Sequence, residues 1–218
     1  MQSILILRFF VGTTVYIPFS SALSGTYNSA CIAKESVLEK YPNADITIID
    51  SKSASRGLGL LVYYANEMLK EGKSKEEIIK WIEENKLKVN HWFTVEDLNH
   101  LARGGRLSKT ASTVGTLLNI KPILHVNNDG KLVSVEKVKG RKKSISALVS
   151  KIEEMIVNPE EQIIFISHGD SLEDAEILKK KILEKIKVKD IAINCIGPAI
   201  GSHAGPGTLA VFFLGNNR

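Results

Sequence analysis

The sequence VYIPFSSALSGTYNSACIAKESVLEKYPNADITIID, residues 15–50, decides the fold. Its two ends, VYIPF at 15–19 and ITIID at 46–50, are short runs rich in β-branched residues, which predict strands. Residues 29–40 between them predict a helix. Strand, helix and strand in this order indicate a βαβ unit with parallel strands.

The rest of the chain continues this alternation. The first helix places Ile32, Val37 and Leu38 on one side. Further elements are predicted as strands at 89–95, 162–170 and 191–198, helices at 58–69, 95–101, 144–156 and 171–186, a helix capped by Ser74 in an S-x-x-E box, and a hairpin at 123–138 around Asn-Asp-Gly. We therefore predict an α/β fold of two layered α/β domains, residues 1–90 with a largely parallel sheet and residues 91–218 with a mixed sheet.

The composition is that of a globular protein, with 218 residues that are 44% hydrophobic and 24% charged. Cys31 and Cys195 are far apart and form no CxxC pattern, which argues against a disulfide framework or a metal site and favours a reducing, cytoplasmic setting. Arg8 interrupts the apolar start, so we expect neither a signal peptide nor a membrane span. Without a GxGxxG or Walker motif, we expect no nucleotide cofactor.

Positive charge is concentrated in residues 103–143, which hold ten Lys or Arg against Asp129 and Glu136, in a chain of net charge +5. Such a stripe suits nucleic acid, phosphate or an acidic partner protein, although it is also compatible with a solvated surface. No zinc-finger spacing or aromatic RNA-binding cluster accompanies Arg103, Arg106 and Lys109, which disfavours nucleic acid.

Two segments are suited to binding an anion. Residues 20–26, SSALSGT, lie where a strand gives way to a helix, so hydroxyls and free helical N–H groups converge there. Residues 197–208, GPAIGSHAGPGT, hold His203 on what we expect to be a stiff, narrow turn. The simpler alternatives are a single hydroxyl cap for the helix and a purely structural loop.

A serine hydrolase is an alternative that can be written from Ser24, His203 and Asp170. The chain has no G-x-S-x-G elbow, which weakens this interpretation. The other histidines, His91 and His125 among them, have no spacing typical of metal ligands and are expected to be packed or at the surface.

Several motifs together resemble those of the DegV family of bacterial fatty-acid-binding proteins. In order along the chain they are SSALSGTYNSA, IIDSKSASRGLGLLV, FTVEDLNHLARGGRLSKTASTVGTLLNIKPILHV, EKVKGRKKS, HGD and IGPAIGSHAGPGT. The resemblance implies a two-domain carrier, not an enzyme, that holds a long-chain fatty acid in an apolar tunnel with the carboxylate near the domain junction. It also implies that a separate kinase subunit phosphorylates the carboxylate, and that no metal or cofactor is needed.

The resemblance also assigns residues. The implied ligand-binding positions are Ser20, Ser21, Ser24, Gly25, Thr26, Gly201, Ser202 and His203. Those implied to face the kinase partner or the phosphoryl group are Arg103, Arg106 and Arg141.

One feature departs from the family pattern. Family members carry a longer segment before the SSALSGTY motif, with a first sheet strand and a TSQPS-type sequence. The start of this chain, MQSILILRFF, does not resemble that segment. We therefore expect the first sheet to have an exposed edge.

Overall fold

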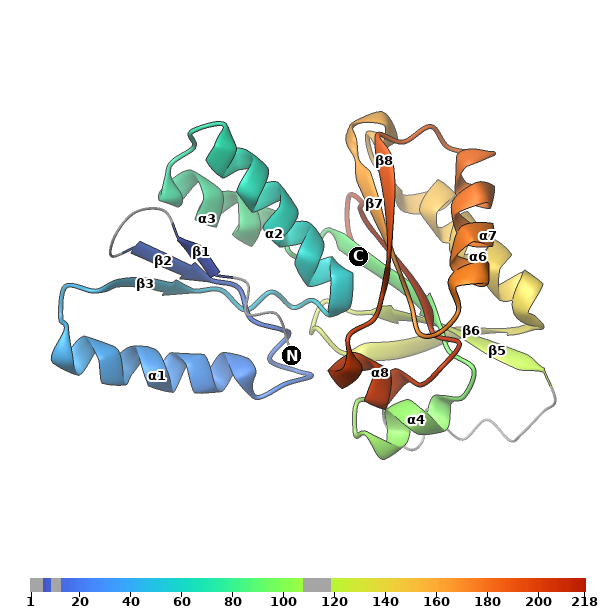
Figure 1. The fold of residues 1–218 in the computed structure, drawn as a ribbon, viewed down its shortest axis with the longest axis horizontal. Coiled ribbons are helices and arrows are strands. Elements are labelled where there is room, and N and C mark those ends of the chain that lie inside the picture. Colours follow the sequence, from blue (N-terminus) through green and yellow to red (C-terminus); the bar gives the residue numbers. More distant parts are fainter. Residues whose placement is uncertain (1–5, 9–12, 108–118) are drawn as a thin grey trace.

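Two β-sheets organise the protein in a computed structural model that describes residues 6–8, 13–107 and 119–218 (Figure 1). The first sheet has the strand order β1 (Ile6–Arg8), β2 (Thr13–Tyr16) and β3 (Asp45–Ile48). β2 and β3 are parallel and are joined by α1 (Thr26–Lys40), so the predicted βαβ unit is confirmed. β1 adds an antiparallel partner to β2.

Helix α1 packs more loosely than its sequence suggested. It begins at Thr26 rather than at Ser29, and none of its residues is fully buried. Ile32 is 56% exposed and Val37 is 37% exposed, so the expectation of an apolar side formed by Ile32, Val37 and Leu38 holds only in part. The physical reason is the narrow first sheet, whose short strands offer little area for a helix of this length to cover.

Two helices cover the opposite face of the first sheet, α2 (Ser55–Lys70) and α3 (Lys75–Asn85) (Figure 1). The predicted capping box at α3 is confirmed. The Ser74 hydroxyl accepts from the Glu77 backbone N–H at 3.2 Å, and the Glu77 carboxylate accepts from the Ser74 backbone N–H at 2.8 Å. This pair satisfies two N–H groups that a helix start would otherwise leave without partners.

The second sheet has six strands in the order β6-β5-β4-β9-β7-β8. Their bounds are β4 (Val89–Thr94), β5 (Ile120–Val126), β6 (Leu132–Lys139), β7 (Ile163–His168), β8 (Asp190–Cys195) and β9 (Leu209–Leu214). β7 and β8 are parallel and the other neighbours are antiparallel, so the sheet is mixed as predicted. The β5–β6 hairpin is confirmed, with Gly130 at φ 79° in its turn.

Helices cover both faces of the second sheet. On one face lie α6 (Arg141–Met155) and α7 (Leu172–Leu183), with the short 3-10 turn Pro159–Glu161 between α6 and β7. On the other face α2 contacts β4, β7 and β9, and the short helices α4 (Leu98–Arg103) and α8 (Pro198–Ala204) pack against each other. This second face carries the candidate site.

The last part of the chain differs most from the prediction. Strand β9, not anticipated from the sequence, is central in the second sheet and buries Val211 and Phe213 completely. The segment expected to be a narrow turn contains helix α8 instead. Pro198 occupies the first helical turn, where a missing N–H costs nothing, and Gly205 ends the helix at φ 81°.

Helix α2 contributes to two hydrophobic clusters. Leu60 and Leu61 pack in the cluster of the second sheet that includes Phe165. Ala65, one turn further on, packs in the cluster of the first sheet that includes Ile49. The domain boundary at residue 90 stays a prediction, since this helix belongs to both cores.

Candidate functional site

A cavity of about 130 Å³ lies between the second sheet and the loops that follow β2 and β3. Its apolar lining residues are Phe19, Leu23, Phe93, Leu101, Val126, Leu132, Ile196, Ile200, Ala210 and Phe212. The sheet supplies one wall because alternate residues of a strand point to the same face, which places Ala210 and Phe212 of β9 beside Phe93 of β4. Such a surface suits a hydrocarbon ligand.

His203 lies in the lining of this cavity, as a residue of α8 that packs against Gly104 at the end of α4. A Cβ atom at position 104 would lie 2.2 Å from His203 Nδ1, so only glycine leaves room for the ring. Gly104 is therefore part of the site through the space that it leaves for the His203 ring.

Arg106 also lines the cavity, although the resemblance implied a position facing the kinase partner or the phosphoryl group. Its Nε donates to the carbonyl of Leu23 at 3.1 Å, and its Nη1 donates to the carbonyl of Gly104 at 2.6 Å. These bonds tie the loop after β2 to the loop after α4. They also hold a guanidinium next to His203, because Gly104 contacts both side chains.

Ser24 and Thr26 mark the start of α1. Ser24 lines the cavity, and its hydroxyl lies 2.7 Å from that of Thr26 and accepts from the Thr26 backbone N–H at 3.3 Å. Gly25, the residue before the helix, is exposed and offers no side-chain cap. The partial positive charge of a helix start thus accompanies the Ser24 hydroxyl. Together, Ser24, Arg106 and His203 give the cavity one polar, electropositive region.

His91 is a lining residue that sequence reasoning did not single out. It is 1% exposed; its Nδ1 donates to the Val89 carbonyl at 2.8 Å, and its Nε2 accepts from the Ala54 N–H at 3.3 Å. Burial first, and then the charge of Arg218, hold the pKa of His91 well below its ordinary value. The sequence did hold a signal for this position. Residues alternate between the two faces of a strand along VNHWFTV, so His91 lies on the same face of the sheet as Phe93.

Ser20 and Ser21 lie outside the cavity lining and have other partners. The Ser20 hydroxyl is buried and donates to the Gly130 carbonyl in the β5–β6 turn at 2.9 Å. Ser21 is exposed, and both its backbone N–H and its hydroxyl bond to the Asp50 carboxylate. Partial burial of Asp50 opposes ionisation, but hydrogen bonds from Ser21 and Lys52 prevail and lower the pKa of Asp50.

Gly201 and Ser202 are on α8 beside His203 but do not line the cavity. Ser202 is exposed, and its hydroxyl donates to the carbonyl of Ala199 at 2.9 Å. The structure therefore brings together Ser24 and His203 from the expected ligand set and adds Arg106 and His91.

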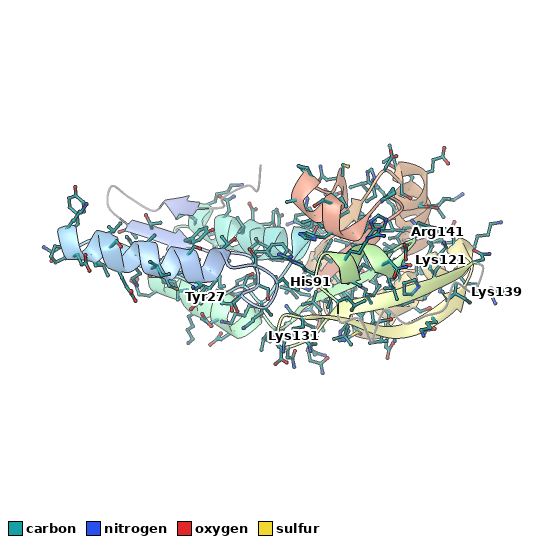
Figure 2. The ribbon with its side chains drawn as sticks, turned by 90° about the horizontal axis from the view of Figure 1, so that it is seen from below. Tyr27, His91, Lys121, Lys131, Lys139 and Arg141 are labelled. Carbon is teal, nitrogen blue, oxygen red and sulfur yellow. The ribbon has the colours of Figure 1, made fainter. Side chains whose placement is uncertain are left out.

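Arg141 does not line the cavity, and Figure 2 shows it well apart from the lining residue His91. Its Nε donates to Asp174 at 2.8 Å, its Nη2 donates to Ser171 at 3.1 Å, and its Nη1 is 3.6 Å from Glu96. Glu96 also pairs with Lys121. Arg141 is thus committed to a network of side chains on the second sheet.

Arg103 is exposed at the end of α4, with its Nη2 3.5 Å from His100 Nδ1. Lys109, another member of the basic stripe, lies outside the described residues.

A second cavity, of about 550 Å³, adjoins the first. The two share the lining residues Phe19, Ser55, Ile196, Ala199 and Ile200. Thr26 lines the second cavity, and so does Ser167, whose buried hydroxyl has no hydrogen-bond partner within the described chain. A ligand longer than the first cavity has room to continue along this shared wall.

The three residues of the alternative hydrolase triad are all described, and no hydrogen bond joins them. The Ser24 hydroxyl bonds to Thr26, and Asp170 is exposed at the end of β7 with φ 48°. A nucleophile, base and orienting acid need contiguous hydrogen bonds. The geometry offers no such chain to Ser24.

Two features are absent from the described residues. None of the helices there combines the length and apolar character that crossing a bilayer requires. Nor do three or more His, Cys, Asp or Glu side chains within residues 13–107 and 119–218 group closely enough to hold a metal ion.

Comparison with known proteins adds independent information. A sequence model described as "Uncharacterised protein, DegV family" matches residues 11–216. A DegV domain-containing protein of Clostridium perfringens is 59% identical over 204 residues, which are 94% of this chain and 70% of that relative.

Solved structures give the same result. A DegV family protein from Ruminococcus gnavus, crystallised with vaccenic acid, matches with a TM-score of 0.85 and 29% identity over 91% of this chain and 70% of its own. The Fatty Acid Kinase (Fak) B3 protein of Streptococcus pneumoniae, loaded with linoleic acid, matches with a TM-score of 0.84 and 28% identity over 93% of this chain and 71% of its own. The chain belongs to the DegV family.

Proposed function

We propose that this protein binds a long-chain fatty acid. The acyl chain would lie in the first cavity, between the second sheet and the loops after β2 and β3, and the carboxylate would lie at Ser24, Arg106 and His203. The observation that carries the proposal is a mostly apolar cavity lining that includes the guanidinium of Arg106, the hydroxyl of Ser24 and the imidazole of His203. Each buried methylene contributes about 0.8 kcal/mol, and a carboxylate gains charge-assisted hydrogen bonds from a guanidinium. The fatty acids carried by the solved relatives support the same ligand class.

The second cavity supports a ligand of considerable length. It shares Phe19 and Ser55 with the first, which supports an acyl chain that extends from one cavity into the other. In this arrangement the protein acts as a carrier, and the side chains around the carboxylate bind it but do not catalyse a reaction.

A direct test uses lipid-free protein. The purified chain is delipidated, incubated with fatty acids of different lengths and measured by native mass spectrometry. We expect one fatty acid per protein, retained less well by His203→Ala at unchanged thermal stability. Folded protein that takes up no fatty acid would refute the proposal.

We further propose that the bound carboxylate is presented to a separate kinase subunit in the cytoplasm. The name of the pneumococcal relative supports this role. The exposed Arg103 is the last residue of α4 and precedes Gly104, which contacts His203, so a partner could approach the carboxylate there. An exposed guanidinium suits an acidic partner or a phosphoryl group.

This second proposal has its own test. The protein, a bacterial fatty-acid kinase subunit and ATP are combined, and acyl phosphate is measured. We expect product only with both proteins present, and we expect Arg103→Met to lose product while still binding fatty acid. Product formation that does not depend on this chain would contradict the proposed partnership.

A further inference from the structure

Within the part of the chain that the structure describes, the hydrogen-bond acceptors of the Arg218 guanidinium are all uncharged. The guanidinium donates to the carbonyls of Lys52 at 2.7 Å, Lys86 at 2.7 Å, Val89 at 2.9 Å and Asn127 at 3.1 Å, and to the Ser53 hydroxyl at 3.3 Å. These five bonds match the five N–H donors of a guanidinium. Burial lowers the pKa of Arg218 to about 10, which leaves it charged at neutral pH.

The acceptors come from separate parts of the fold. Lys52 and Ser53 follow β3 of the first sheet, Lys86 follows α3, and Val89 and Asn127 belong to β4 and the β5–β6 turn of the second sheet. One side chain thus connects the loop that leads into α2 with strand β4 and the β5–β6 turn. A lysine has three donors and no planar fork, so it cannot reproduce this set.

One of these acceptors links Arg218 to the cavity. The Val89 carbonyl that receives Arg218 Nε also receives Nδ1 of His91. Because the opposite nitrogen, Nε2, accepts from the Ala54 N–H, the ring is a neutral Nδ1–H tautomer. A protonated ring would lose the Ala54 bond and would place a charge among apolar residues.

His91 and His203 reach the cavity from different elements, His91 from β4 and His203 from α8. The Thr208 hydroxyl donates to the carbonyl of Ala204, the residue after His203, so Thr208 marks the His203 side of the cavity. His91 of β4 is paired with Phe212 of β9 in the second sheet. Thr208 lies four residues before Phe212, in the segment between α8 and β9. Four residues of an extended strand span about 14 Å. The ring of His91 is therefore remote from Thr208 and next to Phe212, with 5.5 Å between ring centroids.

We propose that Arg218 is a positioning residue that fixes His91 as a neutral imidazole, so that this region of the cavity accepts methylene groups and excludes a carboxylate. The inference rests on the proposed fatty-acid function and deepens it. It gives the ligand a direction, with the carboxylate at His203 and the acyl chain passing His91. The charged or titratable groups that face His91 are Arg218 and His125.

The first measurement needs no lipid. Imidazole ¹⁵N shifts of His91 are followed in the wild type, Arg218→Met, Arg218→Lys and Lys180→Met, which removes an exposed cation from α7. We expect the wild type and Lys180→Met to keep the Nδ1–H form between about pH 5 and 8, and Arg218→Met to begin to protonate toward the acidic end of that range, because burial still lowers the pKa of His91 but the cation is gone. Arg218→Lys, which keeps a cation but not the five bonds, is expected to lie between the two. A wild-type His91 that is protonated or Nε2–H at neutral pH overturns the proposal, even if no Arg218 variant folds.

The second measurement uses fatty-acid affinity in the same folded variants. We expect Arg218→Met to bind fatty acid about tenfold less tightly at pH 5.5 than at pH 7.5, because a charged His91 ring opposes the acyl chain. For Lys180→Met, the ratio of the affinities at the two pH values is expected to equal that of the wild type. An Arg218→Met ratio equal to that of the wild type overturns the proposal. If the wild type binds no fatty acid while His91 behaves as expected, the fatty-acid function fails and the positioning of His91 by Arg218 stands.

Discussion

Gly104 lies directly against the imidazole of His203, and a methyl group at position 104 would overlap Nδ1 at 2.2 Å. The contact joins the end of α4 to α8 and determines where the ring points. Because Gly104 has no side chain, the His203 ring has room to lie in the cavity lining.

We expect Gly104→Ala to displace the His203 ring and to weaken fatty-acid binding about tenfold, because the carboxylate loses one of its partners. The affinity is measured by titration of delipidated protein, with circular dichroism as a check on folding. A double variant with His203→Ala gives the control. If Gly104 acts through His203, the two losses do not add, whereas additive losses would show an independent effect.

The two serines of the SSALSGT segment are expected to behave differently. Ser24→Ala removes a hydroxyl from the cavity lining and is expected to weaken binding about fivefold. Ser21→Ala removes a hydroxyl that bonds to Asp50 outside the cavity, and is expected to leave binding unchanged. Fatty-acid titration of both variants decides the matter, and a larger loss with Ser21→Ala would contradict the assignment.

Ser20 is expected to affect stability rather than ligand contact. Its buried hydroxyl donates to the Gly130 carbonyl, and removing it leaves that acceptor without this partner. We expect Ser20→Ala to lower the free energy of unfolding by about 1–2 kcal/mol, measured by urea denaturation. Ser36→Ala, on the exposed face of α1, is the control and is expected to change stability far less.

Asp50 is expected to make the free energy of unfolding depend on pH in the acidic range. Its pKa is lowered in the folded protein, so the stabilisation that it provides is complete above its ordinary value of 3.8 and is lost as the pH falls through the lower, folded value. Urea denaturation of wild type and Asp50→Asn at neutral and acidic pH measures this. We expect the difference in unfolding free energy to shrink toward low pH. A difference that is independent of pH would mean that the Asp50 charge contributes nothing.

Local signals account for the parts of the fold that the sequence predicted. The capping box at Ser74, the Asn-Asp-Gly hairpin and the alternation of strands and helices all depend on neighbouring residues. Strand β9 was missed although LAVFFL is a short apolar run after a turn, and α8 was missed because Gly and Pro were interpreted as turn residues.

The site was predicted less completely because its assembly depends on contacts between distant residues. The residues near Ser20 and Ser21 in the sequence do not show that the Ser20 hydroxyl bonds to Gly130 and the Ser21 hydroxyl to Asp50. In the same way, Arg106 reaches the cavity through a bond to Leu23, and His91 is fixed by Ala54. A family motif identifies such segments, but only the packing separates cavity residues from their neighbours.

Helix α2 places residues in both hydrophobic cores, with Leu60 and Leu61 in one and Ala65 in the other. Unfolding of this helix would remove side chains from both cores, so we expect a calorimetric scan to show a single transition. A shared helix disfavours movement of the two cavity walls as independent bodies. We therefore expect a fatty acid to enter and leave through local movement of short lining segments, such as the loop carrying Ser24 and the helices α4 and α8.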